Sequence, residues 1–143
     1  MRARIGNQRS RGPGRPRGTA PQQRERLLDA AVRCYARTGI AATRTRDIAD
    51  EAGVTPALVN YYFGSKKKLL GAVVEERYLP VVAELRQRID AAGQDPTGVA
   101  KSFVEAMHAA VARHPWLPAL WVREILMDGG ALRGALLKHV APQ

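Results

Sequence analysis

The stretch from Thr45 to Lys66 reads TRDIADEAGVTPALVNYYFGSK, and it constrains the fold more than any other part of the chain. The hydroxyl of Thr45 can cap a short helix, and Gly53 can end that helix because glycine accepts a positive φ. Thr55 and Pro56 then favour a second helix start, since proline gives up an N–H that is unpaired in the first turn anyway. A helix, a turn containing glycine and a second helix form the helix-turn-helix arrangement.

The second predicted helix has an inner and an outer side. Val59 and Phe63 are four residues apart and are expected to point into a core. Asn60 lies on the outer side, where its amide could pair with adenine in a DNA major groove. The residues predicted to contact DNA from this helix and its cap are Thr55, Pro56, Ala57, Asn60, Tyr61 and Tyr62. The alternative is a helical hairpin packed inside another kind of all-helical domain.

Phosphate contacts are predicted where helices begin, because free N–H groups and the helix dipole favour an anion there. Thr43, Arg44, Thr45 and Arg46 cluster at the start of the first of the two helices. Lys66 opens a further helix with two more lysines behind it, and cations at a helix N-terminus oppose the dipole. This arrangement indicates an anionic partner nearby. The alternative is simple capping with solvated arginines.

The charge distribution points to the same partner. Of a formal net charge of +10, residues 1–20 contribute six arginines without an acidic residue, and residues 71–143 contribute eight charges of each sign. An excess confined to the half with the helix-turn-helix is typical of a nucleic-acid binder. The segment 1–21 is predicted to be a disordered basic arm, in which Arg15 and Arg17 could enter a minor groove. A basic tail that only adds non-specific affinity is the alternative.

Residues 22–70 resemble the DNA-binding domain of the TetR/AcrR family of bacterial transcription regulators. The matching positions are Thr38-Gly39, Ala42 to Thr45, Ile48-Ala49, Ala52 to Val54, Val59 to Phe63, Ser65-Lys66 and Leu69-Leu70. The family most often has tyrosine at the position of Asn60, and an acidic residue at that of Lys67. The resemblance implies that Lys66 contacts a phosphate and that the following helices sense a small molecule and dimerise.

The second half is predicted to be helical throughout. One helix continues from Lys66 to about Ala91 with an interruption at Pro80, and others cover roughly 96–113, 116–127 and 131–140. Family members usually continue for two more helices that pair across a dimer, so residues 71–143 are expected to form an incomplete ligand-sensing and dimerisation domain. The candidate pocket residues are Tyr78, Phe103, Met107, Trp116, Trp121 and Met127. Bulky apolar residues at this spacing could equally be plain core.

Catalytic and metal sites are not predicted. His108, His114 and His139 stand apart from one another, and Cys34 is the sole cysteine, which is expected to be a packed side chain. No cofactor motif, signal peptide or membrane-spanning run is present, so we expect a cytoplasmic protein that does not associate with membranes.

The sequence therefore predicts an all-α, ligand-responsive repressor that binds double-stranded DNA as a homodimer on a palindromic operator. A truncated helical interaction protein with weak, non-specific DNA binding is the alternative.

Overall fold

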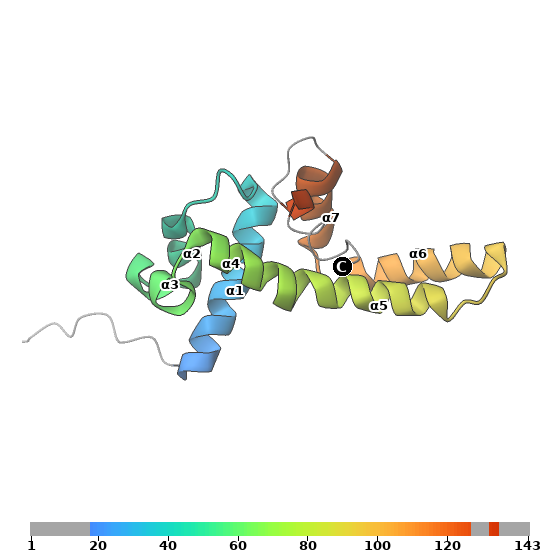
Figure 1. Ribbon diagram of the computed structural model, residues 1–143, viewed down its shortest axis with the longest axis horizontal. Helices are drawn as coiled ribbons and strands as arrows, with labels where there is room; N and C mark the ends of the chain where they lie inside the picture. Colours follow the sequence, from blue (N-terminus) through green and yellow to red (C-terminus); the bar gives the residue numbers. More distant parts are fainter. Residues whose placement is uncertain (1–17, 127–131, 135–143) are drawn as a thin grey trace, which may run out of the picture.

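The computed structural model describes residues 18–126 and 132–134, and these residues form an all-α fold (Figure 1). The N-terminal helices are α1 (Ala20–Thr38), α2 (Thr45–Ala52), α3 (Pro56–Phe63) and α4 (Lys66–Val73). A π-helical turn, η1 (Val74–Tyr78), joins α4 to α5 (Leu79–Asp90). They are followed by α6 (Pro96–Arg113), α7 (Leu117–Trp121) and a second π-helical turn, η2 (Val122–Leu126). The all-helical prediction is confirmed.

Helix α1 is the centre of the N-terminal unit. Its apolar residues recur at helical spacing, so that Leu27, Leu28 and Tyr35 are fully buried. They pack in one core with Ile48 of α2 and Val59 of α3. The helix begins two residues before the predicted Gln22, because the Gln22 side chain accepts a hydrogen bond from the backbone N–H of Thr19 at 3.2 Å.

The predicted long helix from Lys66 to about Ala91 is present as three consecutive pieces, α4, η1 and α5, which together form one continuous rod (Figure 1). The interruption comes as a π-helical turn just before Pro80, where the N–H of Leu79 donates to the carbonyl of Val74. In an α-helix, Pro80 would leave the Glu76 carbonyl without its donor. Here Arg77 Nη1 donates to that carbonyl at 3.3 Å.

The second half packs back onto the first. Helix α6, predicted over roughly 96–113, starts where Asp95 accepts a hydrogen bond from the Gly98 N–H at 2.8 Å. It runs alongside α5, while α7 lies against α1 (Figure 1). Leu117 and Leu120 of α7 belong to the same buried core as Leu28 of α1. The predicted division at residue 70 therefore crosses a continuous core.

Three further findings concern single features. Cys34 is buried in this core, as predicted, and burial raises the pKa of its thiol. No helix within residues 18–126 and 132–134 has the length and apolar character needed to cross a membrane. Of the helix predicted over 131–140, the structure describes residues 132–134, which are helical.

Candidate nucleic-acid interface

The turn between α2 and α3 has the predicted geometry. Gly53 adopts the left-handed conformation, with φ 69° and ψ 35°, and the Val54 N–H donates to the Ala49 carbonyl at 2.9 Å. Pro56 occupies the first turn of α3. Thr55 stands at the cap position, but its side chain makes no capping hydrogen bond, so this detail of the prediction was wrong. The extended backbone of Thr55 and the proline that follows it start the helix.

Helix α3 presents the predicted outer surface. Val59 and Phe63 are buried, whereas Pro56, Ala57 and Asn60 are exposed. Tyr61 is 79% exposed. The side chains proposed to read base edges are therefore free to meet a partner, although their contact with DNA stays a prediction.

Tyr62 lies differently from its neighbour. Its ring is half-buried, and its hydroxyl donates to Gln23 Oε1 of α1 at 3.0 Å. The Tyr61 ring meets the Tyr62 ring edge-on, with centroids 5.3 Å apart. Tyr62 thus holds α3 against α1, and its hydroxyl already has a partner within the protein.

The start of α2 departs from the prediction that Thr45 caps it. Thr45 is the first residue of the helix, and Arg44 occupies the cap position. The cap bond comes from Asp47, whose Oδ2 accepts from the Arg44 N–H at 2.7 Å. An aspartate three residues into the helix supplies this acceptor, so the Thr45 hydroxyl is not needed for it. The side chains of Arg44 and Arg46 are exposed.

Thr43 is fully buried, and its predicted side-chain contact with phosphate was wrong. Its hydroxyl donates to the Gly39 carbonyl at 2.6 Å and lies 2.8 Å from Thr38 Oγ1. A buried hydroxyl must be hydrogen-bonded, and here it closes the turn between α1 and α2. Thr43 therefore shapes the surface that carries Arg44 without being part of it.

Lysines flank this surface at the start of α4. Ser65 caps the helix by accepting from the Lys68 N–H at 3.2 Å. Lys66 Nζ lies 3.3 Å from the Ala41 carbonyl, in the turn that leads to α2. The ammonium group thus sits beside the start of α2, while Lys67 and Lys68 are exposed. The lysines at the start of α4 and the exposed Arg44 and Arg46 at the start of α2 are thus carried by neighbouring parts of the structure.

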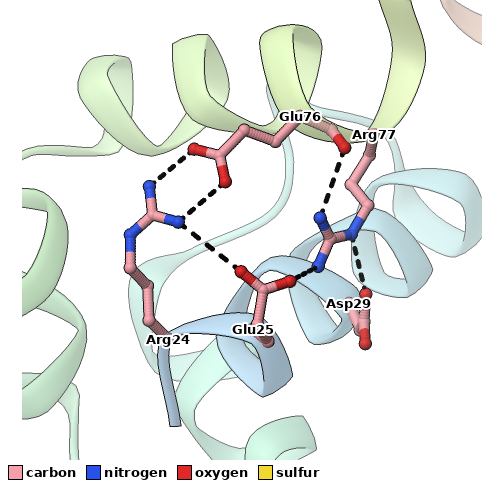
Figure 2. A network of polar contacts seen from close by, with 5 residues as sticks. All are labelled: Arg24, Glu25, Asp29, Glu76 and Arg77. Atoms are coloured by element: carbon pink, nitrogen blue, oxygen red, sulfur yellow. Dashed lines mark hydrogen bonds and ion pairs between the residues drawn. The ribbon is translucent and has the colours of Figure 1, made fainter. Parts of the chain in front are cut away.

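A network of ion pairs joins α1 to η1 (Figure 2). Arg24 forms two bonds with the Glu76 carboxylate, at 2.7 and 2.6 Å. Arg77 bonds Glu25 at 2.5 Å and Asp29 at 2.9 Å. Sequence reasoning missed this network, because residues separated by about 50 positions carry no local signal of their pairing. The one signal in the sequence was the group of charged residues Glu75, Glu76 and Arg77, which interrupts the apolar pattern of the helix predicted from Lys66 to about Ala91.

An apolar cavity of about 270 Å³ lies between α5, α6 and α7. Of the candidate pocket residues, Met107 and Trp121 line it, and the buried Tyr78 stacks on Trp121 with ring centroids 6.3 Å apart. The other lining residues were not predicted: Val81, Val82, Leu85, Val111, Leu117, Pro118 and Val122.

The remaining candidates lie elsewhere. Phe103 is 44% exposed and does not line the cavity, because α6 turns the small residues Ala106 and Ala110 to the core instead. Trp116 borders a separate, charged hollow with Asp29 and Arg77. Arg15, Arg17 and Met127 lie outside the described residues. Among the residues that the structure describes, no cluster of histidine, cysteine and acidic residues could hold a metal ion.

Comparison with known proteins agrees with this geometry. Residues 27–73 match the family described as bacterial regulatory proteins, tetR family. The transcriptional regulator BetI of Brucella anthropi is 40% identical over 75 residues, which are 52% of this chain and 37% of BetI. The transcriptional repressor NicS of Pseudomonas putida is 32% identical over 111 residues, which are 77% of this chain and 51% of NicS.

The crystal structure of HlyIIR, a hemolysin II transcriptional regulator, has the same fold, with a TM-score of 0.70 at 23% identity. The match covers 84% of this chain and 65% of HlyIIR. The chain spans about half or less of the length of BetI and NicS. The segment 27–73 that matches the family contains α2, α3, α4 and most of α1, the same unit that presents the α3 surface. The chain therefore belongs to the TetR family of bacterial regulatory proteins.

Proposed function

We propose that this protein is a DNA-binding transcription regulator that inserts α3 into the major groove. The observation that carries the proposal is the outer surface of α3, where Asn60 and Tyr61 are exposed while Val59 and Phe63 anchor the helix from behind. A helix held rigidly by its inner side can present a fixed set of polar groups to base edges. BetI and NicS, which share the matched segment, are named as transcriptional regulators.

Each part of the surface has a distinct task in this proposal. Asn60 pairs with a base, with adenine as the expected partner. Arg44, Arg46 and Lys66 bind phosphates on either side of the groove, and these contacts position α3 without reading sequence. Lys67 and Lys68 add to the attractive field. Because this role requires chromosomal DNA, we propose that the protein acts in the cytoplasm. We propose no catalytic step, since these relatives are named as regulators.

The operator is proposed to be palindromic and to be bound by two copies of the chain. One short helix contacts only a few base pairs, so a single copy discriminates poorly between sequences. Two α3 helices about 34 Å apart, one turn of DNA, would read two half-sites together. The Arg-rich segment at the N-terminus, with Arg15 and Arg17, is proposed to add contacts in the adjacent minor groove.

The cavity between α5, α6 and α7 is proposed to bind the effector. A cavity of about 150 Å³ lined by apolar side chains holds benzene, so about 270 Å³ has room for a somewhat larger molecule. Its lining consists of aliphatic side chains, Met107, Pro118 and Trp121. A charged ligand would lose its hydration there without gaining a partner. We therefore propose an uncharged, apolar effector that shifts the population between DNA-binding and non-binding conformations.

A salt titration tests DNA recognition. The wild-type protein would be used to select duplexes from a random-sequence library, and its affinity for a selected duplex compared with a scrambled duplex of the same composition. We expect a preference of about 10³-fold or more. In Asn60→Ala the preference should fall while the salt slope stays unchanged. Arg46→Ala should reduce the salt slope by about one, whereas Arg86→Ala on α5 is the control that should leave it unchanged.

The second candidate function is a helical interaction protein with only weak DNA binding. Phe103, Val104, Val122 and Leu126 are exposed in the described part of the chain, and such apolar residues can bind another helical surface. The titration separates the two functions when particle mass is measured in the same buffers. This second candidate would be favoured if the protein is a monomer that binds both duplexes with equal affinity and loses that binding as the salt concentration rises.

Calorimetry tests the effector proposal separately. Toluene and benzoate share a ring and differ by a carboxylate, so we expect heat of binding for toluene and none for benzoate. Val111→Phe, which fills the cavity, should abolish the heat without changing the affinity for DNA. Tight binding of benzoate would contradict the proposed effector class.

A further inference from the structure

Arg24 of α1 contacts two other elements, η1 and α3. Its guanidinium forms a two-bonded pair with Glu76 of η1, at 2.7 and 2.6 Å (Figure 2). The same group lies over the ring of Phe63, with Cζ 5.2 Å from the ring centroid. Phe63 is the last residue of α3. One planar side chain thus lies between η1 and α3.

The neighbouring residue strengthens this connection. Gln23 accepts the hydrogen bond from the Tyr62 hydroxyl at 3.0 Å. The Tyr62 ring in turn meets Tyr61, whose side chain is exposed on the proposed DNA-binding surface. The first turns of α1 therefore hold the end of α3 at two consecutive residues. A small rotation of this part of α1 would change the direction in which Tyr61 points.

The turn η1 holds the other end of this connection. Arg77 bonds Glu25 and Asp29 of α1 and also the carbonyl of Glu76 (Figure 2). Glu76 and Arg77 face α1 together, whereas Tyr78 is buried and stacks on Trp121 at the cavity. π-Helical turns of this kind occur often at functional sites. Here the turn contacts Trp121, which lines the cavity, through Tyr78, and it contacts α1 through Glu76 and Arg77.

We propose that Arg24 is a positioning residue for DNA recognition, which transmits the orientation of η1 to α3 through Glu76 on one side and Phe63 on the other. This inference rests on the proposed function. Glu76 lies in η1 and is not part of the α3 surface. According to this proposal, it nevertheless influences how well the protein distinguishes one DNA sequence from another. The two-bonded geometry matters because it fixes the plane of the guanidinium, and that plane covers the Phe63 ring.

Amide chemical shifts test the positioning directly. In Glu76→Gln the side chain keeps its shape and loses its charge, so the guanidinium plane is no longer fixed. We expect the backbone signals of Asn60, Tyr61 and Tyr62 to shift in ¹H–¹⁵N spectra of the free protein. Glu51→Gln is the matched control, since Glu51 also pairs with α1 arginines, Arg33 and Arg37. It removes the same charge and should leave those three signals in place.

Arg24→Lys separates positioning from simple charge pairing. Lysine keeps a positive charge near Glu76 but has no planar group to cover Phe63. The signals of α3 should therefore shift in this variant although an ion pair with Glu76 persists. If Glu76→Gln does not fold by circular dichroism, Glu76→Asp takes its place, because the shorter side chain keeps the charge but cannot form both bonds.

DNA discrimination provides the second readout. The ratio of affinities for the selected and scrambled duplexes is expected to fall about two- to fivefold in Glu76→Gln, the size expected for a partly exposed ion pair. It should stay unchanged in Glu51→Gln, which alters the net charge equally. Thermal unfolding of both variants shows whether stability alone accounts for the difference.

The outcomes separate the two proposals. Unmoved α3 signals and an unchanged ratio in Glu76→Gln would overturn the role of Arg24, even in a protein that prefers its selected duplex. A wild-type protein that binds the selected and the scrambled duplex equally well would overturn the proposed function. In that case the amide shifts of Asn60, Tyr61 and Tyr62 alone would show whether Arg24 positions α3.

Discussion

Glu124 and the backbone of Ile40 share a buried hydrogen bond across 84 positions of sequence, in which Glu124 Oε1 accepts from the Ile40 N–H at 2.9 Å. The bond ties η2 to the turn that follows α1. Glu124→Ala would leave that N–H without its acceptor, which costs about 1–3 kcal/mol of unfolding free energy. Glu124→Gln keeps an acceptor oxygen and should cost less. Urea unfolding checks this order, and equal losses in both variants would show that the charge matters more than the acceptor.

Gly39 lies at the same contact and should tolerate substitution less well than Gly53. Its backbone, with φ 89° and ψ 156°, is in a region almost restricted to glycine, where other residues pay about 1–3 kcal/mol. A Cβ there would also lie 3.2 Å from Arg123 Cδ and 3.3 Å from Glu124 Oε1. Gly53 is in the left-handed helical region with open space around it, so alanine there costs about 1–2 kcal/mol.

Thermal unfolding of Gly39→Ala and Gly53→Ala, measured in the same buffer, tests this difference. The midpoint should fall further for Gly39→Ala. A larger fall for Gly53→Ala would contradict both reasons for the expected order, the backbone conformation of Gly39 and its close approach to Arg123 and Glu124.

Thr43 should affect stability and leave DNA binding almost unchanged. Thr43→Val removes the hydroxyl that donates to the Gly39 carbonyl at 2.6 Å, and a lost buried hydrogen bond costs about 1–3 kcal/mol. Thr43→Ser retains the hydroxyl and should cost less. The salt slope of DNA binding, measured below the unfolding temperature, should match wild type in both variants. A slope reduced in Thr43→Val but not in Thr43→Ser would restore the hydroxyl as a phosphate contact.

The pair between Arg24 and Glu76 should make stability depend on pH in the acidic range. The hydrogen bonds from Arg24 hold the pKa of the Glu76 carboxyl below its ordinary value of 4.5, against the opposing effect of burial. A lowered pKa in the folded state adds stability above the unfolded value, and that stability is lost as the pH falls through the folded pKa. Glu76→Gln carries no such group.

We therefore expect wild type to be more stable than Glu76→Gln at neutral pH, and the difference in unfolding midpoint to shrink as the pH is lowered below 4.5. Midpoints measured by circular dichroism from neutral to acidic pH check this. A constant difference over the whole range would show that the variant acts through packing and not through the titrating carboxylate.

Much of the fold was predictable because its signals are local. Gly53 ends α2 and Pro56 starts α3 as predicted, since glycine and proline restrict or extend the backbone at their own positions. The exposed side of α3 follows from helical spacing within eight residues. The site was less predictable: the burial of Thr43 and the cap bond from Asp47 depend on how the turn after α1 folds back on itself.

The sequence by itself determined which segments form helices, which side of α3 turns outward, and which half of the chain carries the positive charge. These properties depend on residues within one or two helical turns of each other, or on simple counts. Only the tertiary structure decided that Arg24 meets Glu76, that Glu124 meets Ile40, and that Phe103 turns away from the cavity. Such pairings depend on how whole helices pack, because partners that lie 52 or 84 positions apart are brought together by the burial of the shared core.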